Sequence, residues 1–258
     1  MTSISATILT YNEENRIEQC LKSLDGVADE IIVVDACSSD RTAEICRKWS
    51  NCHVAQRPMR GYGAQRQYAT SLAQYDYVLA IDADEVLSPS LRSEIIRLKN
   101  KGLKHRGYSF SRLNFYCGLP VKHSGWYPDT QIRLFDRRYA NWNLNDVAEK
   151  VIFTDSVLPH PIDGDILHYR CDTPEEYRDT EMAHADLRAK IIAEKGIRPS
   201  FLRPLWEGVK AFVGCYVGDR AIFDGHAGRV ISRQHYTSAH HAYLAARRII
   251  DKKSVASS

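Results

Sequence analysis

The sequence predicts an α/β fold, in which a mixed, mostly parallel sheet is covered by helices and followed by a helical C-terminal region. Three observations support this expectation. Short apolar runs alternate with helical patterns over residues 1–101, as in parallel sheets with both faces covered. After Tyr108, shorter strand-like runs with loops replace this alternation. After Pro174, only helical periodicity remains.

Four strands are expected in the alternating part, because each is a short apolar run bounded by polar residues. They cover Ile4 to Leu9, Ile31 to Val34, the surroundings of Val54, and Tyr77 to Ile81. The carboxyl ends of such strands form a crevice where α/β proteins bind ligands.

Helices are expected between these strands, each with an apolar stripe at helical spacing. The first two stripes consist of Ile17, Cys20, Leu21 and Leu24, and of Ala43, Ile45, Cys46 and Trp49. Ser39 and Asp40 are possible caps of the second helix, and a third helix covers Ala64 to Leu72. A fourth begins at Ser88 and Pro89, a cap followed by proline at the first helical position.

The second half of the chain is expected to extend the sheet and then to become helical. The strand-like runs are Tyr108 to Phe115, Gln131 to Phe135 and Val151 to Phe153. The helical runs are Glu175 to Lys195, Phe201 to Val217 and Ala239 to Ile250. No internal repeat or low-complexity linker interrupts them. We therefore expect one domain over residues 1–170 and a helical appendage over 171–258.

Composition indicates a globular protein, since 44% of the 258 residues are hydrophobic. No apolar run reaches the roughly 18 residues of a membrane-spanning helix, and the N-terminal stretch lacks the basic segment and cleavage site of a signal peptide. The seven cysteines form no CxxC pair or His/Cys cluster. A cytoplasmic protein with reduced thiols is expected.

Positive charge is concentrated near the C-terminus, although the net charge is only +3. From His226 to Lys253 six basic residues stand against one acid, and a solvated helix face is the commoner explanation of such a segment. The run from Phe201 to Tyr216 is apolar on one side, which by itself more often indicates core packing. Together, the two segments resemble an interfacial element that binds an anionic membrane surface peripherally. Binding should weaken when four basic residues become Gln: Arg247, Arg248, Lys252 and Lys253.

The stretch AIDADEVL, residues 80–87, ends a buried strand in three acids, Asp82, Asp84 and Glu85. The first strand ends in TYNEE and the second in DACSSD, so polar residues from three strands are expected at one sheet edge. Each carboxylate desolvated there without a partner would cost roughly several kcal/mol. A hard divalent cation, Mg²⁺ or Mn²⁺, would offset the clustered charge.

The chain lacks both GxxxxGK[ST] and a GxGxxG after its first strand. A sheet-edge site that binds diphosphate through D-x-D and a metal ion, without a glycine loop, indicates a nucleotide-sugar donor. No nucleic-acid partner is expected. A nucleotidyltransferase is a further possibility on a similar sheet, but no Gly-rich basic loop follows the first strand to hold a triphosphate.

Four segments resemble a known family: TILTYNEENRIEQCLKSL, IIVVDACSSDRT, GYGAQRQYA and LAIDADE. Their order and spacing are similar to those of the inverting family 2 glycosyltransferases, which have the Rossmann-like GT-A fold. SGWYPDTQIRLFDRR, DVAEKV, DILHYR and FDGHAG extend the resemblance to bacterial β-glycosyltransferases that include the lipopolysaccharide inner-core glucosyltransferases. The resemblance covers about residues 3 to 230.

The resemblance implies transfer of glucose or a related hexose from a UDP-sugar to a lipopolysaccharide-core or other lipid-linked acceptor. It places the nucleoside against Thr10, Tyr11 and Glu13, with Tyr11 facing the base. Asp35 would accept a hydrogen bond from uracil N3–H, and Arg66 would lie over the same nucleotide.

The resemblance also assigns the reacting end of the donor. Asp82, Ala83 and Asp84 form the D-x-D motif, with Asp82 toward the ribose or donor and Asp84 toward the metal. His168 would complete the metal site, and Glu149 has the position of the catalytic base.

Two further residues, Trp126 and Arg133, are equally compatible with substrate contacts and with structural roles. The subgroup usually has His before the base, where this chain has Ala148, so the identity of the acceptor stays open. A non-catalytic nucleotide-sugar-binding or scaffold protein is the alternative. Considered without the other motif residues, Asp35 would more often be a helix cap, and His168 would more often be a hydrogen-bonded core histidine. The intact acids of the motif and Glu149 favour an enzyme.

Overall fold

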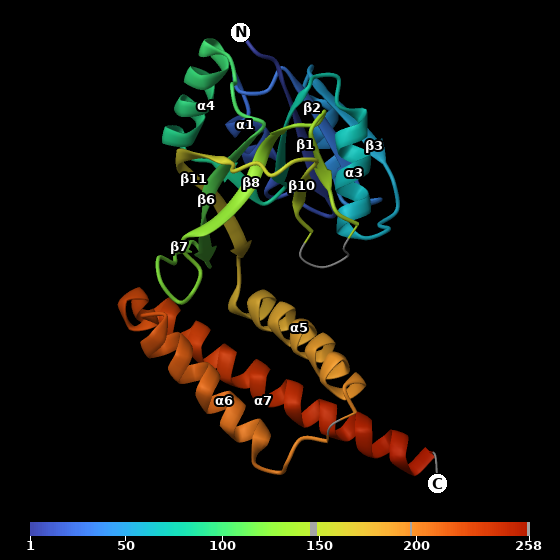
Figure 1. Ribbon diagram of the computed structural model, residues 1–258, viewed down its shortest axis with the longest axis vertical. Coiled ribbons are helices and arrows are strands. Elements are labelled where there is room, and N and C mark those ends of the chain that lie inside the picture. Colours follow the sequence, from blue (N-terminus) through green and yellow to red (C-terminus); the bar gives the residue numbers. More distant parts are fainter. Residues whose placement is uncertain (145–148, 197, 257–258) are drawn as a thin grey trace. The chain divides into compact units, whose positions relative to one another are not determined.

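The computed structural model describes the whole chain except residues 145–148, 197 and 257–258. Two compact units are distinguished in it, and Figure 1 shows their elements. The sheet unit comprises Met1–Arg112 and Asp129–His168, and the helical unit comprises Leu113–Pro128 and Tyr169–Ser258. Residues 113–128, which the sequence analysis counts with the first domain, thus belong to the helical unit.

Parallel strands form one half of the main sheet, in the order β3-β2-β1-β4. These strands are β1 (Ile4–Thr10), β2 (Glu30–Asp35), β3 (Cys52–Gln56) and β4 (Tyr77–Asp82). All four occur where the apolar runs predict them. Their side chains are almost continuously buried in β1, β2 and β4, as expected for strands covered on both faces.

The other half of the sheet makes it mixed, as predicted. β4 pairs antiparallel with β8, and the order continues through β6 and β11 to β5, with β7 paired to β6. These strands are β5 (Glu85–Leu87), β6 (Gly107–Tyr116), β7 (Leu119–Pro120), β8 (Asp129–Asp136) and β11 (His160–Cys171).

One predicted strand does not extend the main sheet. β10 (Val151–Phe153) pairs with β9 (Ala140–Trp142) in a separate two-stranded sheet. Its apolar side chains pack on one face of the main sheet instead of joining its edge. The Phe153 ring lies where a side chain at Gly107 would be, 2.3 Å from an ideal Cβ, so β6 needs glycine at this point.

The helices of the sheet unit follow the predicted pattern. They are α1 (Ile17–Ser23), α2 (Thr42–Arg47), α3 (Tyr62–Leu72) and α4 (Pro89–Lys101). Ser88 caps α4 as expected, because its hydroxyl accepts the Leu91 N–H at 3.3 Å. α2 has Arg41 at its N-cap position without a side-chain cap, so the cap expected at Ser39 or Asp40 is not formed. Asp40 instead accepts the N–H of Thr42, the first residue of the helix, at 3.0 Å.

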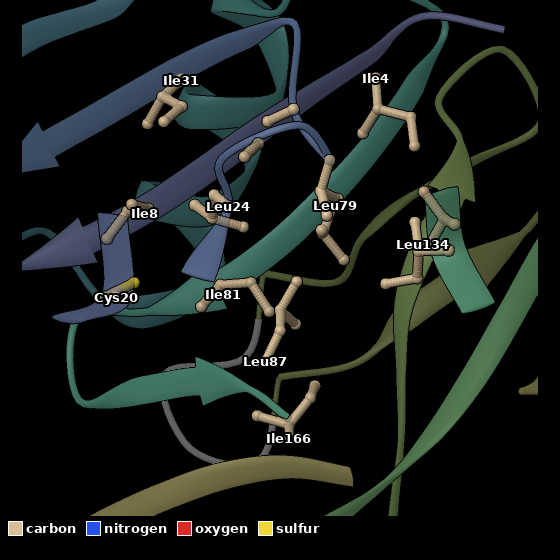
Figure 2. Packing of buried hydrophobic residues seen from close by; sticks show 14 of the residues in the cluster. Ile4, Ile8, Cys20, Leu24, Ile31, Leu79, Ile81, Leu87, Leu134 and Ile166 are labelled. Atoms are coloured by element: carbon tan, nitrogen blue, oxygen red, sulfur yellow. The ribbon is translucent and has the colours of Figure 1, made fainter. Parts of the chain in front are cut away.

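Two apolar clusters fix these helices on opposite faces of the sheet. In the larger cluster, Cys20 and Leu24 at α1 pack on Ile8 of β1 and Ile81 of β4 (Figure 2). In the smaller cluster, Ala69 of α3 packs on the other face with residues of β2, β4 and β9. This arrangement places the N-terminal half of α3, which contains Arg66, beside the carboxyl end of β4.

The α-helices of the helical unit are α5 (Pro174–Glu194), α6 (Arg203–Val213) and α7 (Gly225–Ala256). A π-helical turn and a short 3-10 helix connect α6 to α7. α7 begins well before the predicted Ala239, because small side chains such as Ala227, Ser232 and Ser238 form much of its buried side and give a weak apolar pattern. None of the helices in the described ranges has both the length and the hydropathy needed to cross a bilayer. All seven cysteines are free.

Candidate active site

The ends of β1, β2 and β4 meet at one edge of the sheet, as the sequence predicts. Thr10 of β1 lies opposite Asp35 of β2, and Leu9 lies opposite Asp82 of β4. Three polar strand endings therefore lie at one edge of the sheet, at the carboxyl end of the parallel strands, where α/β proteins bind ligands.

Glu85 fixes the turn that carries the two aspartates of the D-x-D motif. β4 ends at Asp82 and β5 begins at Glu85, with Asp84 in the turn between them. Glu85 is fully buried, and its Oε2 accepts the Asp82 N–H at 2.9 Å. Its Oε1 accepts hydrogen bonds from Arg133 at 3.0 Å and Arg112 at 3.1 Å. Removing either arginine would leave buried charge less compensated, so this acid has a structural role.

Arg66 joins two carboxylates from distant parts of the chain. It lies on α3 with its side chain buried, and its Nη2 donates to Asp82 Oδ1 at 2.8 Å and Oδ2 at 3.0 Å. Its Nε donates to Glu149 Oε1 at 2.9 Å. The guanidinium lies 4.6 Å from the centre of the Trp142 ring, which restricts its position further. Arg66 thus holds the expected base beside the expected donor-binding aspartate.

Asp82 lies between two guanidinium groups, because Arg133 Nη2 donates to its Oδ2 at 3.0 Å. Burial raises the pKa of Asp82, but the charges of Arg66 and Arg133 outweigh burial and hold the pKa well below its ordinary value of 3.8. Burial also acts to lower the pKa of Arg133, and Glu85 and Asp82 reverse this effect and raise it. Asp82 and Arg133 therefore keep their charges at neutral pH.

These ion pairs predict a pH dependence of stability. Because the folded-state pKa of Asp82 is depressed, its contribution is present above the unfolded pKa of about 3.9 and is lost as the pH falls toward the folded-state pKa. Asp82→Asn should therefore lower the free energy of unfolding at neutral pH and make its decline below about pH 4 shallower. Urea unfolding across this range measures both effects, and identical slopes in the two proteins would show that the pairs add no net stability.

Asp84 and His168 form the second pair of expected site residues that the fold brings together. β11 pairs with β5 so that His168 lies opposite Glu85, and His168 Nε2 is 3.1 Å from Asp84 Oδ2. No group of three or more His, Cys, Asp or Glu side chains in the described part of the chain could hold a metal ion. One carboxylate and one imidazole fit a divalent cation that takes its remaining ligands from substrate phosphates and water.

Asp35 is fully buried at the end of β2, and it organises the loop that follows. Both of its oxygens accept the Ser38 N–H at 3.2 Å, and Oδ2 also accepts from Gln56 Nε2 at 3.0 Å. The Ser38 hydroxyl donates to Oδ1 as well. A structural role in this loop is therefore established by geometry, and contact with a base remains a prediction.

The residues after β1 combine an exposed ring with a buried hydroxyl. Tyr11 is 59% exposed, so its ring is available for stacking. Thr10 is buried, and its Oγ1 has no hydrogen-bond partner among the described atoms. Glu13 pairs with Arg16 at 3.2 Å. The exposed Tyr11 ring is thus a group that this edge offers to a ligand, whereas the Thr10 hydroxyl is enclosed by the fold.

The other three expected residues, Ala83, Arg133 and Trp126, are buried. Ala83 is buried in the turn between Asp82 and Asp84. The Arg133 side chain is buried among acids. Trp126 belongs to the helical unit, where its ring packs edge-on against Tyr177 at 5.7 Å. Ala148, where the resembling subgroup has histidine, lies outside the described residues.

Three residues of the charged cluster were not assigned a role from the sequence: Glu85, Arg112 and Trp142. Glu85 follows the D-x-D motif directly. An acid next to a buried strand needs a cationic partner, so its position in the sequence indicated such a contact. Arg112 and Trp142 had no such signal, because their contacts to Glu85 and Arg66 bridge long stretches of sequence.

Comparison with known proteins identifies relatives of the whole chain. The family model described as glycosyl transferase family 2 matches residues 5–116. An uncharacterized glycosyltransferase of Rickettsia typhi is 30% identical over 225 residues, which cover 82% of this chain and 77% of the relative. The lipopolysaccharide core biosynthesis glycosyltransferase LpsC of Rhizobium meliloti is 25% identical over 256 residues, which cover 98% of this chain and 93% of LpsC.

A solved structure shares the fold. The mannosyltransferase PcManGT of Pyrobaculum calidifontis, determined in complex with GDP-Man and Mn²⁺, matches with a TM-score of 0.51 at 17% sequence identity. The match covers 95% of this chain and 86% of PcManGT. At this level of identity the similarity concerns the fold alone.

Proposed function

Because the chain belongs to the family 2 glycosyltransferases and has their GT-A fold, we propose that it transfers a hexose, with inversion, from a UDP-sugar to a glycan hydroxyl. The proposed acceptor is the lipopolysaccharide core or another lipid-linked glycan. The observation that carries the proposal is the cluster in which Arg66 holds Asp82 and Glu149 together. Similarity to LpsC over nearly the whole chain supports the class of acceptor.

Glu149 is the proposed general base. It would accept the proton of the acceptor hydroxyl while that oxygen attacks the anomeric carbon of the donor. The new glycosidic C–O bond forms as the bond from the anomeric carbon to the diphosphate oxygen breaks, and the electron pair leaves with UDP. Direct attack inverts the configuration and needs no second carboxylate as nucleophile, in contrast to a retaining glycosidase. Arg66 fixes the position of Glu149 for this step.

The donor diphosphate is proposed to bind at the turn after β4. Asp84 and His168 would hold a Mg²⁺ or Mn²⁺ ion there, which when bound would neutralise charge on the leaving diphosphate. Asp82 is fixed by Arg66 and Arg133, so its carboxylate is held ready for a hydroxyl group of the donor. This preorganisation lowers the entropic cost of orienting the reactants.

Uridine is expected to be preferred over guanosine. Tyr11 can stack with either base, while Asp35 at the end of β2 is the proposed acceptor for N3–H of uracil and suits the smaller pyrimidine edge. Calorimetric titration with UDP and GDP in the presence of Mn²⁺ measures the preference. Tighter metal-dependent binding of GDP would refute it.

A panel of nucleotide sugars tests the proposed function. Each donor is titrated calorimetrically with Mn²⁺, with Mg²⁺ and with EDTA, and the donor that binds best is then offered to truncated lipopolysaccharide acceptors. We expect metal-dependent binding of one UDP-hexose and release of UDP when the acceptor is present. Metal-dependent donor binding without turnover on any acceptor would instead favour the non-catalytic nucleotide-sugar-binding alternative.

A further inference from the structure

α6 packs against α7 through its smallest side chains. Pro204 and Gly208 are the buried residues of α6, and Cys215 continues the same side in the turn that follows. A Cβ atom at Gly208 would lie 2.9 Å from the Tyr236 ring of α7, so the two helices are in close contact there. The large apolar side chains of α6 are therefore not needed for this packing.

Large apolar side chains of α6, and of the segments just before and after it, are exposed instead. Phe201 is 79% exposed, Trp206 is 63% exposed and Phe223, beyond the turn, is 72% exposed. The outward face, as we name it here, also contains Leu202, Leu205, Val209, Val213, Val217 and Ile222. A surface helix normally turns its apolar stripe toward the core, and a group of neighbouring, exposed, large apolar side chains indicates an interaction site.

A row of arginines on α7 borders the outward face. Arg229 and Arg233 are one helical turn apart, and Arg247 follows Arg229 by about five turns at 3.6 residues per turn, so all three share one side of α7. Arg229 and Arg233 line a groove of about 410 Å³ whose other wall is formed by Phe212 and Tyr216. At the other end, the Arg247 guanidinium lies 5.6 Å from the centre of the Phe201 ring.

We propose that the outward face and this arginine row bind the surface of an anionic phospholipid bilayer. An amphipathic helix with exposed aromatic and aliphatic side chains inserts these at the boundary between headgroups and acyl chains. Arginines at its border then meet lipid phosphates, with which guanidinium groups form paired hydrogen bonds. No ion pair to an acidic side chain occupies Arg229 or Arg233 within the described residues.

A second copy of the chain fits this surface less well than a bilayer. A two-fold interface places the same patch of both copies face to face. Two outward faces in contact would bring two arginine rows to one interface, where like charges repel. A bilayer with anionic headgroups supplies the opposite charge along the whole row and apolar volume beneath it.

Vesicle binding of the 258-residue chain tests the proposal. We expect flotation with vesicles of equal parts phosphatidylcholine and phosphatidylglycerol at low salt, weaker binding at high salt, and little binding to phosphatidylcholine alone. Arg229→Gln with Arg233→Gln should reduce partitioning roughly 20- to 30-fold, since each basic residue contributes about fivefold. The matched control is Lys22→Gln with Lys48→Gln, which removes two exposed charges from the sheet unit and should have little effect.

Trp206 gives a second readout, because Trp126 and Trp142 are buried and Trp49 is partly buried. Its fluorescence should shift to the blue and be quenched by brominated acyl chains when anionic vesicles are added, and Trp206→Phe should lose this signal while still floating. Failure of the protein to float at low salt would overturn the proposal. An equal loss of binding in the Lys22→Gln, Lys48→Gln control would also overturn it. A dimer detected by light scattering and dissociated by Trp206→Ser would overturn it as well.

Discussion

Replacing Glu149 with Gln is expected to lower the rate of sugar transfer at least about 100-fold, within the usual contribution of a general base. The amide keeps an oxygen that can accept the Arg66 Nε hydrogen bond, which measures 2.9 Å to the carboxylate. It cannot take up the proton of the acceptor hydroxyl. Donor affinity should stay unchanged, since the substitution preserves shape. UDP release reports the rate, and calorimetry reports the affinity.

The matched control for this substitution is Glu44→Gln. Glu44 lies exposed on α2 and pairs with Lys48 at 3.0 Å, so its replacement should leave transfer unchanged. If Glu149→Gln loses donor binding but turns over bound donor at the normal rate, Glu149 is a donor ligand and the base must be sought elsewhere.

Replacing Asp84 with Ala is expected to abolish metal-dependent turnover while the protein stays folded. Asp84 lies in the turn after β4, and its Oδ2 is 3.1 Å from His168 Nε2. The turn itself is held by Glu85, which accepts the Asp82 N–H and is fixed by Arg133. Loss of Asp84 therefore removes the proposed metal ligand and leaves the ion pairs of Asp82 and Glu85 in place. Turnover against Mn²⁺ concentration and urea unfolding measure the two effects separately.

Asp163→Ala is the control for Asp84→Ala. Asp163 is an exposed carboxylate on β11, the strand that also carries His168, so its loss should change neither turnover nor metal dependence. His168→Ala should shift the metal dependence in the same direction as Asp84→Ala. Full activity of the Asp84 variant would remove these two residues from the proposed metal site.

The parallel half of the sheet could be predicted from the sequence because local patterns determine it. The apolar runs that became β1 and β4 are continuous, and Ser88 with Pro89 marks the start of α4 unambiguously. The convergence of Thr10, Asp35 and the D-x-D motif followed from one rule, that parallel strands end at one edge of a sheet. Periodicity and topology were sufficient for this part of the site.

The connections within the site could not be predicted, because they depend on tertiary contacts. Arg66 and Glu149 are 83 positions apart, and nothing near either residue indicates the hydrogen bond between them. The pairing of β10 with β9 was missed for the same reason. The apolar residues of β10 are equally compatible with a strand of the main sheet and with a strand that packs on the face of that sheet. The helix predicted from Ala239 is shorter than α7. Small residues such as Ala227 and Ser238 form the buried side of the earlier turns, so the sequence there has no clear apolar stripe.

The most direct test of the proposed reaction is the anomeric configuration of its product. Full-length protein is incubated with Mn²⁺, a truncated lipopolysaccharide acceptor and the α-linked UDP-sugar that binds best, and the new linkage is determined by NMR. We expect a β-linked product that does not form with EDTA and forms at least about 100-fold more slowly with Glu149→Gln. An α-linked product, or equal rates with Glu149 and Gln at this position, would contradict transfer by inversion with Glu149 as base.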